Sequence, residues 1–246
     1  MLLALFLIDL AAGLVLFLPL VGRRNAGVKF YRLILITSGA LAICAALAHY
    51  AAHARTLLAY DAAPVVLTLI VYATLRYPKR NVYRVPAALL AIAYLVLPVL
   101  TWQSATHAPL GWSIAGALSS VALLGSVNLA MLLGHWYLVV RGMAIDPLKR
   151  LSVAALVAPI VKVLVVVIAI IAGGAWSEVA VRQGIFFWMR AGWGLIGPLA
   201  LFPMVWGTVR IRSTMAATGI LYVDVVAVVI GEVLGAWLSA LVHLPV

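Results

Sequence analysis

Hydrophobic residues occur in this chain in eight long runs, and polar residues are mostly confined to short gaps between the runs. Most runs reach the ~20 residues that a helix needs to cross the hydrocarbon core of a bilayer. They are too continuously apolar for the alternating strands of a membrane barrel. The pattern therefore predicts eight transmembrane helices, at residues Leu2–Val21, Leu33–Ala52, Thr56–Leu75, Val85–Thr101, Trp112–Val140, Leu151–Gly173, Ile185–Val209 and Met215–Leu241.

Composition supports the same fold class. The chain is 67% hydrophobic and only 9% charged, with a mean hydropathy of +1.20, which excludes a soluble globule of 246 residues. The gaps between the runs are too short for a soluble domain. We therefore expect an all-α, multi-pass membrane bundle that forms a single domain over residues 1–246.

Charge predicts the orientation of the bundle. Thirteen of the seventeen Lys and Arg residues fall in four alternate gaps, at Gly22–Arg32, Arg76–Arg84, Arg141–Arg150 and Arg210–Ser213. Short loops rich in Lys and Arg stay cytoplasmic, so both termini are expected on the non-cytoplasmic side. The net charge of +11 is explained by these loops and by anionic lipid headgroups, without nucleic-acid binding. The expected location is a cell membrane, of the bacterial inner-membrane type.

Charged residues inside the runs are the first candidates for function, because each costs ~2.5–3.5 kcal/mol to insert and therefore faces a partner or a cavity. Asp9, Arg190 and Glu232 fall in the outer half of the expected bundle, and Lys162 and Asp224 near its middle. In a functional interpretation, protons are bound and transferred by Glu232, Asp224 and Lys162, and a ligand is bound by Asp9 and Arg190. In a structural interpretation, buried pairs fix helix packing: Lys162 with Asp224, and Arg190 with Glu232 or Asp9.

Histidines suggest two further sites. His49 and His53 are four residues apart, a spacing that places them on one face of a helix and allows them to grip one transition metal or contribute to a haem site. Alternatively, they belong to an interfacial aromatic belt. His135 follows Asn128 by two turns on roughly the same helix face, and both are candidates for ligand binding. His135 could hydrogen-bond a quinone carbonyl, ligate a haem together with a group from another helix, or transfer a proton. The alternative for His135 is an interfacial role beside Trp136.

Glycine and proline mark two helices. Pro198 and Pro203 lie in a glycine-rich stretch of the seventh run, which we expect to be kinked. Gly231 and Gly235 form a Gly-xxx-Gly notch suited to close helix contact. No internal repeat is predicted, because the two halves do not align in their charged or glycine positions.

Two functional hypotheses follow, since no specific catalytic or cofactor motif is present. The preferred one is a membrane subunit of an electron-transfer complex that binds quinone or haem b and contacts other protein subunits, including redox partners on the outer face. The other is a small secondary transporter or an ion or proton channel that uses the intramembrane carboxylates and Lys162. The missing repeat counts against a transporter.

Overall fold

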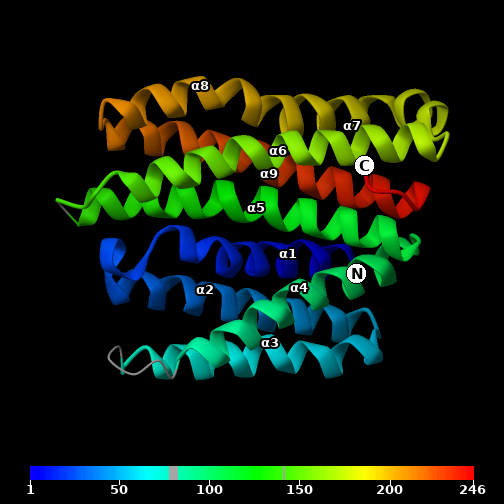
Figure 1. Cartoon of the computed structure of the whole chain (residues 1–246). Helices are drawn as coiled ribbons and strands as arrows, with labels where there is room; N and C mark the ends of the chain where they lie inside the picture. The colour runs from blue at the N-terminus through cyan, green and yellow to red at the C-terminus, as the bar shows by residue number, and fades with distance from the viewer. Residues whose placement is uncertain (78–82, 141) are drawn as a thin grey trace.

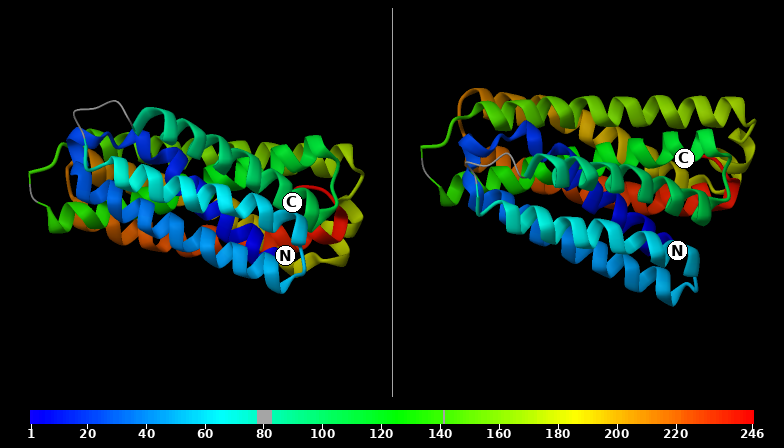
Figure 2. Two further views of the ribbon diagram at one scale, coloured as in Figure 1. Left: turned by 90° about the horizontal axis from the view of Figure 1, so that it is seen from below. Right: turned by 60° about the horizontal axis from the view of Figure 1, so that its bottom comes forward.

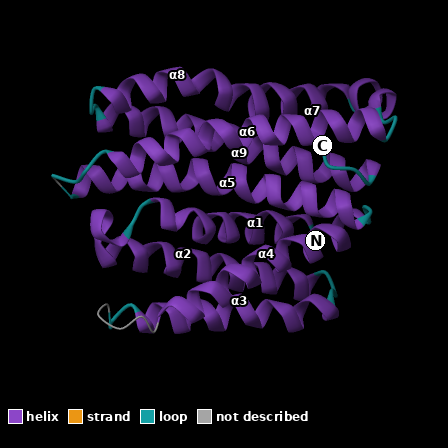
Figure 3. Cartoon of the chain, in the orientation of Figure 1, coloured by secondary structure: helices purple, strands orange, loops and turns teal. Residues whose placement is uncertain are grey.

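The computed structural model describes residues 1–77, 83–140 and 142–246. All regular structure in these ranges is helical, and eight helical segments are long and apolar enough to cross a membrane (Figures 1 and 3). This confirms the predicted all-α fold and the prediction of eight helical segments of membrane-spanning length. Lys79, Arg80 and Arg141 of the basic segments lie outside the described residues.

The helices extend beyond the apolar runs at several ends, because a helix continues into the interface after its hydrophobic section stops. The helix after the first basic segment, for example, begins at Arg23 instead of Leu33 and is interrupted at Gly27, where φ is +77°. The elements are α1 (Leu2–Phe17), η1 (Leu18–Leu20), α2 (Arg23–Ala51), α3 (Arg55–Thr74), α4 (Arg84–Thr106), α5 (Leu110–Val139), α6 (Asp146–Ala172), η3 (Ser177–Arg182), α7 (Gly184–Met189), η4 (Arg190–Ile196), α8 (Gly197–Arg210) and α9 (Thr214–Val242).

The helices pack as two rings of four. In the N-terminal half α1, α2, α3 and α4 contact one another in sequence, and α4 returns to α1. In the C-terminal half α5, α6, α8 and α9 repeat this order, and α9 returns to α5. The rings meet through α1 with α5, α4 with α5, and α1 with α9. The packing order therefore repeats between the halves, although their charged and glycine positions do not align.

Both chain termini lie at one end of the bundle, as Figures 1 and 2 show, and we call it the termini end. The connections from η1 to α2, from α5 to α6 and from α8 to α9 lie at the opposite end, which we call the basic end. An even number of crossings brings both termini to the same end. The assignment of the basic end to the cytoplasm stays a prediction.

Helices α1 and α5 occupy the centre of the bundle and approach each other closely at two glycines. A Cβ atom added to Gly13 would lie 2.5 Å from the Cα of Gly125, so neither position has room for a side chain. A similar crossing joins η4 to α9, where a Cβ on Gly194 would lie 2.5 Å from the Cα of Gly231. These contacts bring the polar residues of α1, α5, η4 and α9 to the same interior.

The seventh span, residues 184–210, combines α7, η4 and α8. Its irregularity is a π-helical segment, Arg190–Ile196, which ends just before Pro198. Proline lacks a backbone N–H and disturbs the regular i to i−4 hydrogen bonds. The amide of Gly197 accordingly bonds to the carbonyl of Gly192, five residues earlier. Such π segments occur frequently at functional sites.

Candidate functional site

Four buried charged residues meet inside the bundle, in the half nearer the termini end. They are Asp9 of α1, Lys162 of α6, Arg190 of η4 and Glu232 of α9, and each is no more than 5% exposed. We call these four residues the charge centre. Two cations and two carboxylates give it a balanced formal charge, which lowers the high cost of burying each group alone.

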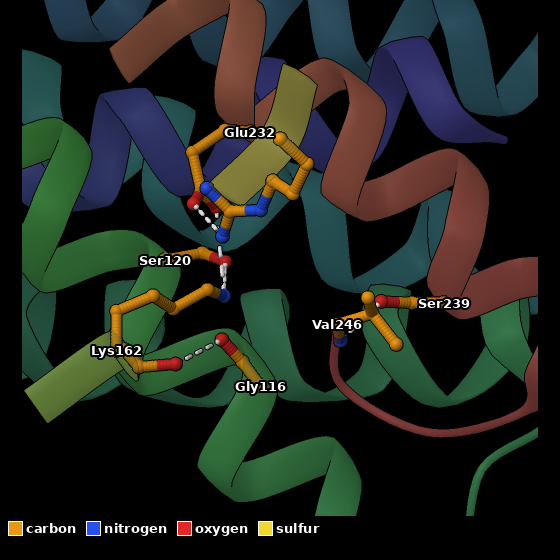
Figure 4. Close-up of polar contacts among 8 residues, drawn as sticks. Gly116, Ser120, Lys162, Glu232, Ser239 and Val246 are labelled. Atoms are coloured by element: carbon orange, nitrogen blue, oxygen red, sulfur yellow. Dashed lines mark hydrogen bonds and ion pairs between the residues drawn. The ribbon is translucent and has the colours of Figure 1, made fainter. Parts of the chain in front are cut away.

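Glu232 is the shared partner of the two cations (Figure 4). Its Oε1 accepts a hydrogen bond from Nη2 of Arg190 at 2.8 Å, and its Oε2 lies 3.6 Å from Nζ of Lys162. Lys162 also donates a hydrogen bond of 2.7 Å to Oγ of Ser120 on α5. Asp9 is close enough to interact electrostatically with Glu232 and Lys162. The predicted pairing of Arg190 with Glu232 is therefore confirmed.

Glycines make the slot that holds the Arg190 guanidinium. A Cβ added to Gly194 would lie 2.6 Å from its Nη1, and one added to Gly235 would lie 2.7 Å from its Nε. The Gly-xxx-Gly notch around Glu232 thus serves both helix packing and the placement of Arg190. The sequence analysis assigned only helix packing to Gly231 and Gly235. Their positions beside Glu232, one residue before it and three residues after it, could have indicated that they also make room for its partner.

The charge centre has unused hydrogen-bonding capacity. Nε and Nη1 of Arg190 and Oδ1 of Asp9 are buried without a hydrogen-bond partner among the described residues. Nζ of Lys162 lies 5.8 Å from the centre of the Trp102 ring, and the indole N–H of Trp102 is directed at the Asp9 carboxylate. Buried polar groups are rarely left unpaired, so such groups call for a functional or structural explanation.

The predicted pair of Lys162 with Asp224 is wrong. Lys162 turns toward Glu232 and Ser120, whereas Asp224 precedes Glu232 by eight residues, which is ~12 Å along the axis of α9. Asp224 is buried, and its Oδ1 has no hydrogen-bond partner in the described part of the chain. Lys162 and Asp224 were expected at similar depths in the membrane, but depth alone does not determine the direction in which a side chain points.

A second buried polar cluster lies in the N-terminal half. Nδ1 of His49 on α2 is 2.9 Å from Oδ2 of Asp61 on α3, and its Nε2 is 3.4 Å from Oγ1 of Thr101 on α4. Both His49 and Asp61 are buried. The sequence analysis considered His49 only together with His53 and did not pair it with Asp61.

The structure does not bring His49 and His53 together. Helix α2 ends at Ala51, and His53 adopts a left-handed backbone with φ of +56°, which removes the helical four-residue spacing. His53 is exposed while His49 is buried. Among the described residues, no group of three or more His, Cys, Asp or Glu side chains is arranged to hold a metal ion.

His135 and Asn128 are also separated from the charge centre and from each other. His135 is exposed on α5 and lies 3.4 Å from the hydroxyl of Tyr222. Asn128 is buried, and its amide donates to the carbonyl of Leu124 at 2.8 Å. Neither contact involves a ligand, so the roles of His135 and Asn128 at a ligand stay predictions.

The charge centre is a closed, charge-balanced network in which a proton gained by Glu232 would weaken two ion pairs at once. No charge-centre residue lines any of the cavities found among the described residues, and the cavity of about 600 Å³ is at the basic end. No protein-family model, curated protein or solved structure matches this chain.

Proposed function

We propose that this chain is a proton-translocating membrane protein, a channel or small transporter, in which Glu232 of the charge centre is the proton-binding group. The observation that carries the proposal is the bridging of Arg190 and Lys162 by the single carboxylate of Glu232, at 2.8 and 3.6 Å. An intramembrane ionisable residue that faces the bundle interior is typical of proton and ion pathways.

Protonation of Glu232 has a defined consequence in this geometry. It removes the negative charge that both cations share, and it leaves Arg190 and Lys162 facing each other across the interface of α6, η4 and α9. Repulsion between them then favours separation of these helices. A charge change at a packed interface with two arrangements is a general way to open a path.

Other buried groups extend the polar interior toward the basic end. Thr218 of α9 faces Gly134 of α5, because a Cβ on Gly134 would lie 2.7 Å from the Thr218 hydroxyl oxygen. With Ser120 of α5 near Glu232, this antiparallel register places Asp224 at the level of Asn128, between the charge centre and the basic end. Asp224 is therefore the next proton acceptor in the proposed path.

The repeated packing of the two halves also supports a transporter, because internal structural repeats are common in transporter folds. The other hypothesis, an electron-transfer subunit, receives less support. A buried haem needs axial ligands, and the one buried histidine in the described ranges, His49, is already bonded to Asp61 and close to Thr101. A quinone version of that hypothesis would have to use a cavity away from the charge centre.

The proposal is tested by reconstituting the chain in liposomes that contain a pH-sensitive dye and imposing a potassium diffusion potential. We expect the wild-type chain to carry protons well above the rate of empty liposomes, and Glu232→Gln to reduce the flux to that background. The matched control is Glu178→Gln, because Glu178 pairs with Arg182 in an exposed contact of 2.7 Å. Background flux from the wild-type chain, or full flux from Glu232→Gln, would contradict the proposal.

A further inference from the structure

A cavity of about 600 Å³ lies at the basic end of the N-terminal ring of helices. Residues of α1, η1, α2, α3 and α4 line it, so it lies between the four helices of one half, and no charge-centre residue is part of its lining. Its size falls within the ~300–1,000 Å³ that is usual for small-molecule sites.

The lining has two chemically different parts. One part is a continuous apolar wall, and the other is a polar mouth. Side chains of α1 to α4 form the wall, including Val15, Leu35, Val71, Leu75 and Leu90. The mouth contains Arg23, Asn25, Tyr31 and Tyr83. A long apolar wall next to a compact polar mouth fits an amphiphile.

Arg23 is the group in the mouth that remains available for a ligand. The Tyr31 hydroxyl donates to the carbonyl of Leu18, and the Asn25 amide donates to that of Val21, both at 3.1 Å. The Arg23 guanidinium lies over the Tyr83 ring, 4.5 Å from its centre. Its Nη2 is buried but has no hydrogen-bond partner in the described ranges.

The mouth carries positive charge without a compensating carboxylate. None of the lining residues is acidic. Asp146, the one acidic residue in the four basic segments, lies at the start of α6 and pairs with Lys149 at 3.9 Å. A partly buried guanidinium with a free N–H favours phosphate or carboxylate oxygens, to which arginine binds strongly.

We propose that this cavity binds an anionic membrane phospholipid, with its phosphate on Arg23 and one acyl chain along the wall of Val15, Leu35, Val71, Leu75 and Leu90. The wall selects a lipid over free phosphate, because only a lipid buries apolar surface there. This lipid site shares no residue with the proposed proton path, so the lipid proposal does not depend on the proposed function. Basic segments at the same end add a general attraction for anionic lipid.

Native mass spectrometry of the purified full chain tests the site, by titration with dioleoylphosphatidylglycerol or dioleoylphosphatidylcholine. We expect a bound phosphatidylglycerol that survives detergent and little bound phosphatidylcholine. Arg23→Gln should weaken phosphatidylglycerol binding at least ~10-fold, the effect of losing a charged hydrogen bond. Arg84→Gln removes the same charge from an exposed residue outside the lining, and it should leave binding unchanged.

A second variant tests the acyl-chain wall independently of charge. Ala87 lines the cavity, so Ala87→Phe should fill the space and abolish lipid binding, while thermal unfolding remains at or above the wild-type temperature. Equal binding of the two lipids, or unchanged binding by both Arg23→Gln and Ala87→Phe, overturns the proposal. Displacement of the lipid by inorganic phosphate would instead identify a free-phosphate site, and preferential binding of added ubiquinone a quinone site; either result also overturns it.

Discussion

Removal of the Glu232 carboxylate should destabilise the bundle more than removal of either cation. Glu232 lies 2.8 Å from Arg190 and 3.6 Å from Lys162. At an effective dielectric constant of ~20, these contacts correspond to attractions of about 6 and about 5 kcal/mol before desolvation is subtracted. Glu232→Gln loses both attractions, whereas Lys162→Met leaves Glu232 paired with Arg190.

We therefore expect Glu232→Gln to cost ~3–5 kcal/mol of unfolding free energy, the range for breaking a buried pair. Lys162→Met should cost less, ~1–3 kcal/mol. The double variant should lose ~3 kcal/mol less than the sum, because Arg190 is then left without the repulsion of Lys162. At the middle of both ranges this makes the double variant ~1 kcal/mol more stable than Glu232→Gln. Unfolding by sodium dodecyl sulfate in mixed micelles, followed by far-ultraviolet circular dichroism, measures all four free energies.

A control cycle on the same helices combines Lys162→Met with Asp224→Asn. Asp224 is eight residues from Glu232, or ~12 Å along α9, so these two losses should add within ~0.5 kcal/mol. The reasoning is refuted if the Lys162 and Glu232 losses are additive, or if the Lys162 and Asp224 cycle shows the larger coupling.

Three further predictions concern packing, the second polar cluster and orientation. Gly13→Leu should prevent the contact of α1 with α5 and cost at least ~3 kcal/mol, whereas Gly111→Ala, which meets no neighbour, should be neutral in the same unfolding assay. Asp61→Asn should cost ~1.5–3 kcal/mol by weakening the bond to His49, and a neutral result would remove that pair as a stabilising contact. On a cysteine-free background, an impermeant thiol reagent added to intact cells should label a cysteine at position 181 and not one at position 144; the reverse pattern would invert the topology.

The sequence was sufficient to predict the eight helices, because a hydrophobic run of membrane length has few alternative structures in lipid. It was also sufficient to predict which charged residues lie in the interior. It could not choose their partners, since position along a helix does not determine the rotation of that helix about its axis. Lys162 consequently contacts Glu232 and not Asp224.

Local backbone geometry limited the remaining predictions. The predicted metal pair of His49 and His53 required a helix that continues past Ala51. Helix α2 ends at Ala51, and the left-handed backbone at His53 turns the chain away from the helical path. The π-helical segment that begins at Arg190 has no simple sequence pattern beyond the following Pro198. The repeated order of helix contacts was missed because equivalent packing does not require equivalent charged residues.

The most direct test of the central claim measures proton flux and stability together for Glu232→Gln and for the double variant Lys162→Met with Glu232→Gln. If Glu232 is the proton-binding group, the double variant recovers part of the lost stability through charge balance but still carries protons at the rate of empty liposomes. If the charge centre only holds the helices together, flux returns with stability. Wild-type flux from a stable double variant would therefore contradict the account.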